Sequence, residues 1–193
     1  MNSTNSTADI LHYPFEVPKG WMWVQLKDVF DFNPKNKLED ETIVSFIPMT
    51  FISDSFSNKH TYETRKWKDI KKGFTHFQER DVGIAKITPC FENRKSVVFQ
   101  NLENGYGAGT TELHILRPKS EFILSDYLLW FVKTDRFINE GISCFTGAVG
   151  QQRVGKNIIE ETYFPLPPLT EQKRIVKKIE SIFQALDLIQ DNL

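Results

Sequence analysis

The sequence predicts an α+β protein, a mixed α/β body followed by one long C-terminal coiled-coil helix. Three observations carry this prediction. Short strand-like runs separated by turn residues occupy the middle of the chain, at 82–88, 96–100 and 112–117. Apolar residues at helical spacing follow from Ser125 to Asn139. After Pro167 and Pro168 the apolar spacing becomes a strict alternation of four and three, which is typical of a coiled-coil seam.

Length and composition fit one domain with an appendage. The chain has 193 residues, of which 40% are hydrophobic, with 16 Phe and 4 Trp. We expect an N-terminal lead over 1–20, a body over 21–166 and a helical arm over 167–193. The longest apolar run of the body, Tyr127 to Val132, is far shorter than a membrane span, and residues 2–7 lack the basic and apolar regions of a secretion signal. These features predict a cytoplasmic protein without membrane contact.

The elements of the body follow from local patterns, taken in chain order. A short helix near 25–30 should precede a polar turn at 33–36 and a strand over 43–51. Residues 53–80 show no clean period and are predicted to be rich in loops. The three strands follow, with turns at Asn93 and in the glycine-rich run 105–109. A helix over 125–139 with Ser125 as its N-cap, a helical turn over 156–161 and an extended segment over 163–169 complete the body.

The arm is predicted to begin near Thr170, whose hydroxyl can cap the helix, while Glu171 is favourably placed in the first turn. A stripe this narrow favours a second helix beside it, so we expect a dimer or subunit interface. The alternative is that the stripe folds back onto its own body, because so short a coiled coil is marginal alone. The predicted interface residues are Ile175, Ile179, Ile182, Leu186, Ile189 and Leu193.

The sequence contains little evidence of catalytic motifs. The glycine run 105–109 precedes a predicted strand, whereas a phosphate-binding loop needs a helix. In the run 165–168, Leu166 stands where an amino-methyltransferase needs an amide or carboxylate, and apolar residues precede Lys86 where a nuclease carries metal-binding acids. Several His, Cys, Ser and Thr residues lack the spacing of metal ligands or the surrounding motif of a catalytic nucleophile. They are His12, His60, His76, His114, Cys90, Cys144, Ser143 and Thr146. The sequence therefore predicts a protein that is not an enzyme and has no metal or cofactor of its own.

Charge is unevenly distributed along the chain. The net charge of −1 argues against nucleic-acid binding by bulk electrostatics alone. Between Lys59 and Lys95, however, ten Lys or Arg stand against five Asp or Glu, whereas 9–41 has four basic and seven acidic residues. A basic stretch interleaved with aromatic residues favours contact with a polyanion.

Polar loops supply the candidate DNA-binding residues. Amides can pair with adenine edges and arginine with guanine, while lysines, hydroxyls and backbone N–H groups contact phosphates. We expect Lys86, Arg94, Lys95, Arg153 and Lys156 to contact mainly phosphates, and Gln151, Gln152 and the stretch 59–72 to include base readers. The full set is Lys59, Tyr62, Arg65, Lys66, Lys71, Lys72, Lys86, Thr88, Asn93, Arg94, Lys95, Gly147, Gln151, Gln152, Arg153 and Lys156.

Five strings, at 20–26, 85–93, 109–118, 146–154 and 165–176, together resemble the target recognition domain of type I restriction–modification specificity subunits. They span almost the whole chain in the order typical of that family. The resemblance implies two such domains in a complete subunit, each followed by a long helix, with the helices paired antiparallel as a spacer. This chain has one domain and one helix. Two departures are Arg94, where glycine is common, and Thr170, which replaces a usual alanine.

The resemblance implies a division of labour between subunits. Methyl transfer from S-adenosylmethionine to adenine N6 belongs to modification (methyltransferase) subunits, and cleavage to a restriction subunit that uses ATP and Mg. We therefore expect a non-catalytic reader of double-stranded DNA, either a half-length specificity subunit or half of a longer one, that directs its partners to a bipartite site. It is also expected to form a homodimer through the C-terminal helix.

Two alternatives remain open at this point. One is an interaction or decoy module that binds the methyltransferase through its helix without reading DNA. The other is the recognition domain of a fused restriction–methylation enzyme, which the lack of a catalytic motif ahead of Trp21 disfavours.

Overall fold

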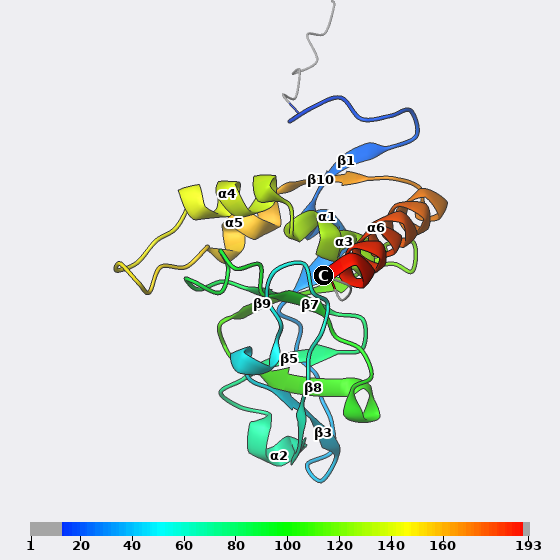
Figure 1. The fold of residues 1–193 in the computed structure, drawn as a ribbon. Coiled ribbons are helices and arrows are strands. Elements are labelled where there is room, and N and C mark those ends of the chain that lie inside the picture. Colours follow the sequence, from blue (N-terminus) through cyan, green and yellow to red (C-terminus); the bar gives the residue numbers. More distant parts are fainter. Residues whose placement is uncertain (1–12, 191–193) are drawn as a thin grey trace, which may run out of the picture.

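The computed structural model describes residues 13–190, which form three sheets and six α-helices (Figure 1). The first four-stranded sheet has the order β2-β9-β6-β7 and is antiparallel throughout. Its strands are β2 (Phe30–Phe32), β6 (Val82–Ala85), β7 (Ser96–Val98) and β9 (Leu113–Pro118). The second has the order β4-β3-β8-β5, in which β3 and β8 run parallel. Its strands are β3 (Ile43–Ile47), β4 (Glu63–Lys66), β5 (Thr75–Gln78) and β8 (Tyr106–Gly109).

The first sheet is the middle layer of the body. Successive side chains of a strand point to opposite faces of the sheet. Val82 and Ile84 therefore pack in one hydrophobic core, and Ala85 packs in another. The first core is covered by α3 (Ser125–Val132), α4 (Asp135–Ser143) and α5 (Lys156–Glu161), whereas the second is shared with β5 through the stacked rings of Phe77 and Phe99. Figure 1 shows α3, α4 and α5 above the first sheet, and the second sheet, with α2 (Trp67–Ile70), below it. The predicted mixed α/β body is therefore confirmed.

The remaining small elements close the body. The two-stranded sheet pairs β1 (Met22–Gln25) with β10 (Tyr163–Leu166), and α1 (Leu26–Val29) follows β1 directly. A capping box at Gln25 and Asp28 starts α1. The helices α1 and α5 agree with the prediction, and β10 forms the first four residues of the predicted extended segment 163–169, whose last residue, Leu169, already belongs to α6. Two 3-10 turns, η1 (Met49–Phe51) and η2 (Glu103–Gly105), precede loop 52–62 and β8.

The glycine run 105–109 is predicted as a turn, and this is wrong for four of its five residues, because Tyr106–Gly109 form strand β8; Gly105, with a φ of 75°, ends the 3-10 turn η2. Two glycines of β8 are required by close packing. A Cβ on Gly107 would lie 2.3 Å from the Phe77 ring, and one on Gly109 would lie 2.1 Å from the carbonyl oxygen of Ile47. The strand contains several glycines because neighbouring backbones and aromatic rings contact it on both sides and leave no room for larger residues.

Two other predicted elements are also corrected. The helix expected over 125–139 is two helices, α3 and α4, separated at Lys133 and Thr134, and the Thr134 hydroxyl accepts the amide of Phe137 as the N-cap of α4. Ser125 is not an N-cap, since its hydroxyl donates to the carbonyl of Arg80. The expected strand over 43–51 ends at Ile47, and residues 53–80 contain β4, α2 (Trp67–Ile70) and β5 in addition to loops.

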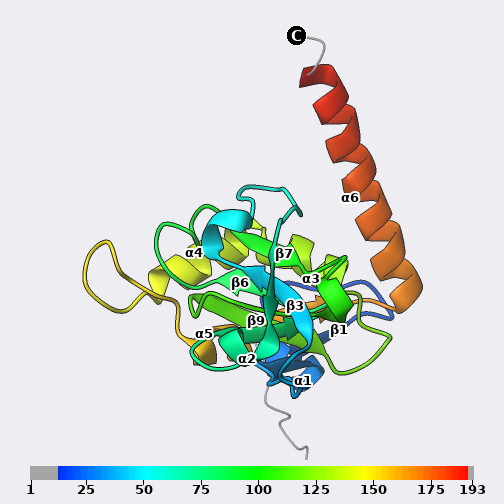
Figure 2. The ribbon, with the colours of Figure 1, turned by 90° about the horizontal axis from the view of Figure 1, so that it is seen from below.

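The arm is α6 (Leu169–Gln190), which leaves the body and ends far from it (Figure 2). It starts one residue before Thr170, so that residue lies inside the first turn and does not cap the helix. The first turns are fixed by Gln172, whose amide donates to the carbonyls of Phe122 (3.0 Å) and Pro167 (2.9 Å) and whose oxygen accepts the amide of Leu124 (2.8 Å). Further along, the Phe183 ring stacks on Trp130 and Phe56.

The arm thus packs on its own body through a stripe beside the predicted seam. Of the seam, Ile182, Leu186 and Ile189 are 47%, 52% and 59% exposed, whereas Ile175 lies against the first core. Leu193 lies outside the described residues. None of the helices described is both long and apolar enough to cross a bilayer.

Candidate nucleic-acid interface

The basic stretch 59–72 is largely neutralised by an acidic segment that precedes it in the chain. Glu41 pairs with Lys66 (2.6 Å) and Lys68 (2.7 Å), and Asp40 pairs with Lys71 (2.6 Å). Hydrogen bonds from Lys66 and Lys68 lower the pKa of the Glu41 carboxyl to about 2. The acidic and basic segments of the sequence therefore meet, and little unbalanced charge remains at this end of the second sheet.

The other predicted residues of this stretch differ in their surroundings. Arg65 pairs with Glu63 (3.1 Å) and lies over the Phe46 ring, 3.8 Å from its centroid. Lys59 and Lys72 have no acidic partner among the described residues, and Tyr62 is 38% exposed. Lys59 and Tyr62 line a cavity that is described below, and their side chains have no hydrogen-bond or ion-pair partner among the described residues.

A second group of predicted residues meets where β6 and β9 adjoin. The guanidinium of Arg153 donates to both carboxylate oxygens of Glu112, at 2.9 and 2.8 Å, and lowers the pKa of that carboxyl. Lys86 follows β6, and its backbone bonds both Glu112 (3.0 Å) and Val154 (2.9 Å). The side chain of Lys86 has no hydrogen bond or ion pair within residues 13–190. This group therefore holds one free cation beside an arginine whose side chain is 41% exposed.

Loop 144–153 projects from the body between α4 and α5 (Figure 1). It closes as a hairpin by the Thr146 to Arg153 bridge, and Gly147 (φ 112°) and Gly150 (φ 81°) supply the positive φ angles of its turns. Val149 at its tip is 96% exposed. Gln151 is exposed, whereas Gln152 is half-buried and its carbonyl accepts the amide of Thr88 at 3.0 Å.

Residues 93–95 serve the body's own structure. Arg94 pairs with Asp135, donates to the carbonyl of Lys133 (3.0 Å) and lies over the Phe56 ring. Lys95 donates to the carbonyls of Ile52 (2.9 Å) and Met49 (3.3 Å). Their charged ends are thus committed to internal partners, although Asn93 is exposed. Lys156 pairs with Glu160 (2.8 Å) on the surface of α5.

The cavity at Lys59 and Tyr62 has walls that the sequence did not predict. We call it the β7-edge cleft; it has a volume of about 480 Å³ and is lined by Asn58, Lys59, His60, Thr61, Tyr62, Val98, Gln100 and Asn101. Gln100 and Asn101 lie about 40 residues from the loop that they face. Nothing in their local sequence pattern indicates a site, because only the pairing of loop 52–62 with β7 brings them to it.

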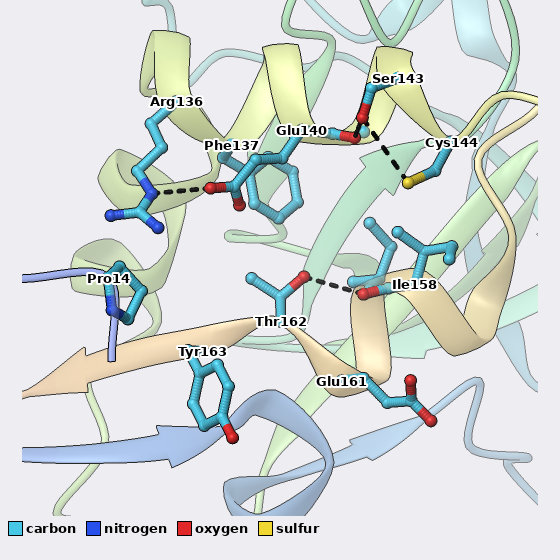
Figure 3. A pocket seen from close by; sticks show the side chains of 12 residues that line it. Pro14, Arg136, Phe137, Glu140, Ser143, Cys144, Ile158, Glu161, Thr162 and Tyr163 are labelled. Atoms are coloured by element: carbon cyan, nitrogen blue, oxygen red, sulfur yellow. Dashed lines mark hydrogen bonds and ion pairs between the residues drawn. The ribbon is translucent and has the colours of Figure 1, made fainter. Parts of the chain in front are cut away.

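A second pocket, of about 340 Å³, lies between α4, α5 and β10 and contains Cys144 and Ser143 (Figure 3). The Ser143 hydroxyl donates to the carbonyl of Glu140 (2.7 Å), and Thr162 donates to Ile158 (2.8 Å). Among the described residues that line this pocket there is no histidine, and the Glu140 carboxylate is paired with Arg136 (2.8 Å). Among residues 13–190 no three His, Cys, Asp or Glu side chains are grouped as a metal site.

Solved structures with this architecture define the class of fold. The HsdS subunit from Thermoanaerobacter tengcongensis matches 92% of this chain and 46% of its own with a TM-score of 0.74 at 21% identity. A chain from a structure that describes assembly and conformational transition of the type I R-M system matches with a TM-score of 0.67, also at 21% identity, over 94% of this chain and 43% of its own. The fold is therefore that of HsdS domains.

Sequence comparison gives the family. Residues 18–193 match the family described as type I restriction modification DNA specificity domain. The chain is 47% identical to the EcoAI specificity subunit and 43% identical to the EcoEI specificity subunit of the type I restriction enzymes from Escherichia coli, over 92% of its own length. It spans 30% of the length of each of these relatives. The chain belongs to the type I restriction–modification DNA specificity family.

Proposed function

We propose that this chain is a non-catalytic reader of double-stranded DNA that directs partner subunits to their target. The observation that carries this proposal is the match of almost the whole chain to the specificity family, on a body whose exposed loops are polar. DNA adenine methyltransferase subunits would transfer the methyl group of S-adenosylmethionine, and a restriction subunit would cleave with ATP and Mg. The proposed location is the cytoplasm, and the chain itself would need no cofactor.

We propose that phosphate contacts come from the cations with free or exchangeable ends. Lys59, Lys72 and Lys86 lack acidic partners within the described residues, and Arg153 is exposed enough to share its guanidinium with a phosphate. The exposed hairpin 144–153 supports a role for Gly147, Gln151 and Gln152 at the DNA. Arg94 and Lys95 would act indirectly, by holding the turn at 93–95 through internal bonds.

The near-neutral net charge of the chain is consistent with a DNA-binding protein whose partner subunits also contact the DNA. Several of the predicted cations, among them Lys66 and Lys71, are already balanced by acids. A protein with few free cations has weak non-specific affinity, since each phosphate contact adds a counterion term. We therefore propose that partner subunits supply much of the phosphate contact and that this chain supplies the sequence discrimination.

We propose that the arm is a spacer and an interface. A helix of 22 residues is about 33 Å long at 1.5 Å per residue, close to one turn of B-DNA. If the exposed seams of two copies pair antiparallel, a two-fold axis crosses the helices and puts one reader at each end. The target of such a homodimer is an interrupted palindrome. If the chain is half of a longer subunit, its partner domain differs and the bipartite site is asymmetric.

The test is selection from a random duplex library by the chain together with its methyltransferase. We expect enrichment of one motif. Replacement Lys86→Ala should weaken binding to all sequences and reduce the slope of log affinity against log salt by about one. The matched control is Lys178→Ala, an exposed lysine on α6 outside the proposed DNA surface.

Each alternative result has a defined meaning. Binding to the methyltransferase without any sequence enrichment would favour the decoy module instead. Equal salt slopes for wild type, Lys86→Ala and Lys178→Ala would place the DNA surface elsewhere on the body.

A further inference from the structure

We propose that the β7-edge cleft is a base-reading site and that Asn101, assisted by Gln100, is a specificity-determining residue. This inference rests on the proposed function and assigns one part of the body to sequence discrimination. The reading groups would be amides that face the loop 58–62.

The cleft exists because side chains, in place of a backbone strand, satisfy the edge of β7. The Oδ1 of Asn58 accepts the amide of Val98 at 2.9 Å, and the Nε2 of His60 accepts the amide of Gln100 at 3.2 Å. Burial lowers the pKa of His60, so its ring is neutral at pH 7 and Nε2 can act as an acceptor. A side chain that bonds the strand spans more distance than the backbone hydrogen bond between two paired strands. The backbone of loop 58–62 is therefore held further from β7 than a paired strand would be.

Satisfying an edge in this way protects it from pairing with another chain. It also leaves an open space, of about 480 Å³, where a further strand would otherwise pack. The backbone amides of Val98 and Gln100 donate these two hydrogen bonds. They are two residues apart, as the two-residue period of a strand requires for groups at the same edge. The cleft is thus built into the framework of the sheet, and its position does not depend on a mobile tip.

The lining of the cleft combines unused hydrogen-bonding groups with an absence of acids. The polar ends of Lys59, Tyr62 and Asn101 have no hydrogen-bond or ion-pair partner among the described residues. The amide of Gln100 makes one long contact, 3.5 Å, with Asp126. Among the described residues that line the cleft, six side chains are uncharged polar groups or an aromatic phenol, and Lys59 is the one cation. A surface built for phosphates alone would need more cations, so this chemistry favours base edges.

Asn101 is held in place by contacts of its backbone. Its amide donates to Glu79 (2.9 Å), and the next amide, of Leu102, donates to the other oxygen of the same carboxylate (3.1 Å). Its φ of 55° lies in the left-handed region, which asparagine adopts more readily than most residues. The side-chain amide is therefore presented at a fixed point while both of its polar atoms stay available.

An amide with a free donor and a free acceptor matches the N6 and N7 edge of adenine in the major groove. Gln100 beside it can bond the same or the neighbouring base pair, and Lys59 can contact a purine acceptor or a phosphate. The proposed ligand is accordingly an adenine-containing base step of double-stranded DNA.

The experiment repeats the library selection with Asn101→Gly and Asn101→Asp, each in the presence of the methyltransferase. Glycine removes the amide and keeps the positive φ without strain. Aspartate keeps the shape and exchanges the donor for an acceptor. The matched control is Asn139→Ala, which removes an exposed asparagine on α4. Thermal unfolding of each variant checks that the body remains folded.

We expect both Asn101 variants to lose about tenfold or more in discrimination at one base pair, a change of about 1.4 kcal/mol, while the rest of the motif is unchanged. Asn139→Ala should keep the wild-type motif. A folded Asn101→Gly and a folded Asn101→Asp that both select the wild-type motif at every position would overturn the inference. Failure of the wild type to select any motif would instead overturn the proposed function on which it rests.

Discussion

Lys133 is fully buried, and its charge should make the stability of the body depend on pH. Its ammonium donates to the carbonyls of Ser55 and Arg94, each at 2.8 Å, and so ties loop 52–62 and the turn at 93–95 to the end of α3. Burial, and to a lesser extent the charge of Arg94, lower its pKa from 10.5 to about 7, while Asp54 opposes the shift. No carboxylate bonds the ammonium directly among the described residues.

The magnitude follows from the pKa difference between the two states. Between pH 7 and 10.5 the unfolded chain binds more protons at this site than the folded chain, so the free energy of unfolding rises with pH. The slope from this one residue approaches 1.4 kcal/mol per pH unit. Its contribution should increase by about 2 to 3 kcal/mol from pH 7 to pH 9 and stay constant below about pH 6.

The replacement Lys133→Met isolates the contribution of Lys133 titration to the free energy of unfolding, because methionine has similar length and no charge. Urea unfolding of wild type and variant at pH 6, 7, 8 and 9 gives two curves whose difference cancels the titration of all unchanged groups. We expect the stability of wild type relative to the variant to rise above pH 7. A difference that is the same at all four pH values would show that Lys133 does not titrate in this range and that the reasoning is wrong.

Two further predictions concern packing and assembly. Gly109→Ala should lower the free energy of unfolding by about 3 kcal/mol or more in urea titrations, because the added Cβ would lie 2.1 Å from the Ile47 carbonyl oxygen and the backbone of β3 must move; an unchanged midpoint would contradict the packing of β8. Ile182→Asp with Leu186→Asp should abolish self-association in sedimentation experiments while the unfolding of the body is unchanged, with Ala185→Asp as the exposed control; a double variant that still dimerises would remove the seam from the interface.

Local patterns in the sequence predicted those elements whose form depends on their own residues. The strands β6, β7 and β9, the helix α5 and the arm follow from period and turn residues, whereas both predicted caps, Ser125 and Thr170, are wrong. The predictions failed where a distant partner decides the structure. Residues 106–109 form a strand because β3 pairs with them and the Phe77 ring packs against them, and a local pattern of glycines does not indicate such neighbours.

The candidate site shows the same limit. Charge counting along 59–95 indicated a basic surface, yet Asp40 and Glu41 come back to neutralise Lys66, Lys68 and Lys71. Arg94, which is predicted to contact phosphates, pairs with Asp135. The DNA-binding assignments themselves stay predictions, and Gln100 and Asn101 join them only because loop 52–62 crosses the edge of β7.

The central claim is that this chain chooses the DNA sequence on which a methyltransferase acts. The most direct measurement is methylation mapping of genomic DNA from cells that hold the methyltransferase with this chain, with its Ile182→Asp, Leu186→Asp variant, or alone. We expect N6-methyladenine in one bipartite motif only when the unaltered chain is present. Methylation of the same motif without the chain would contradict the account.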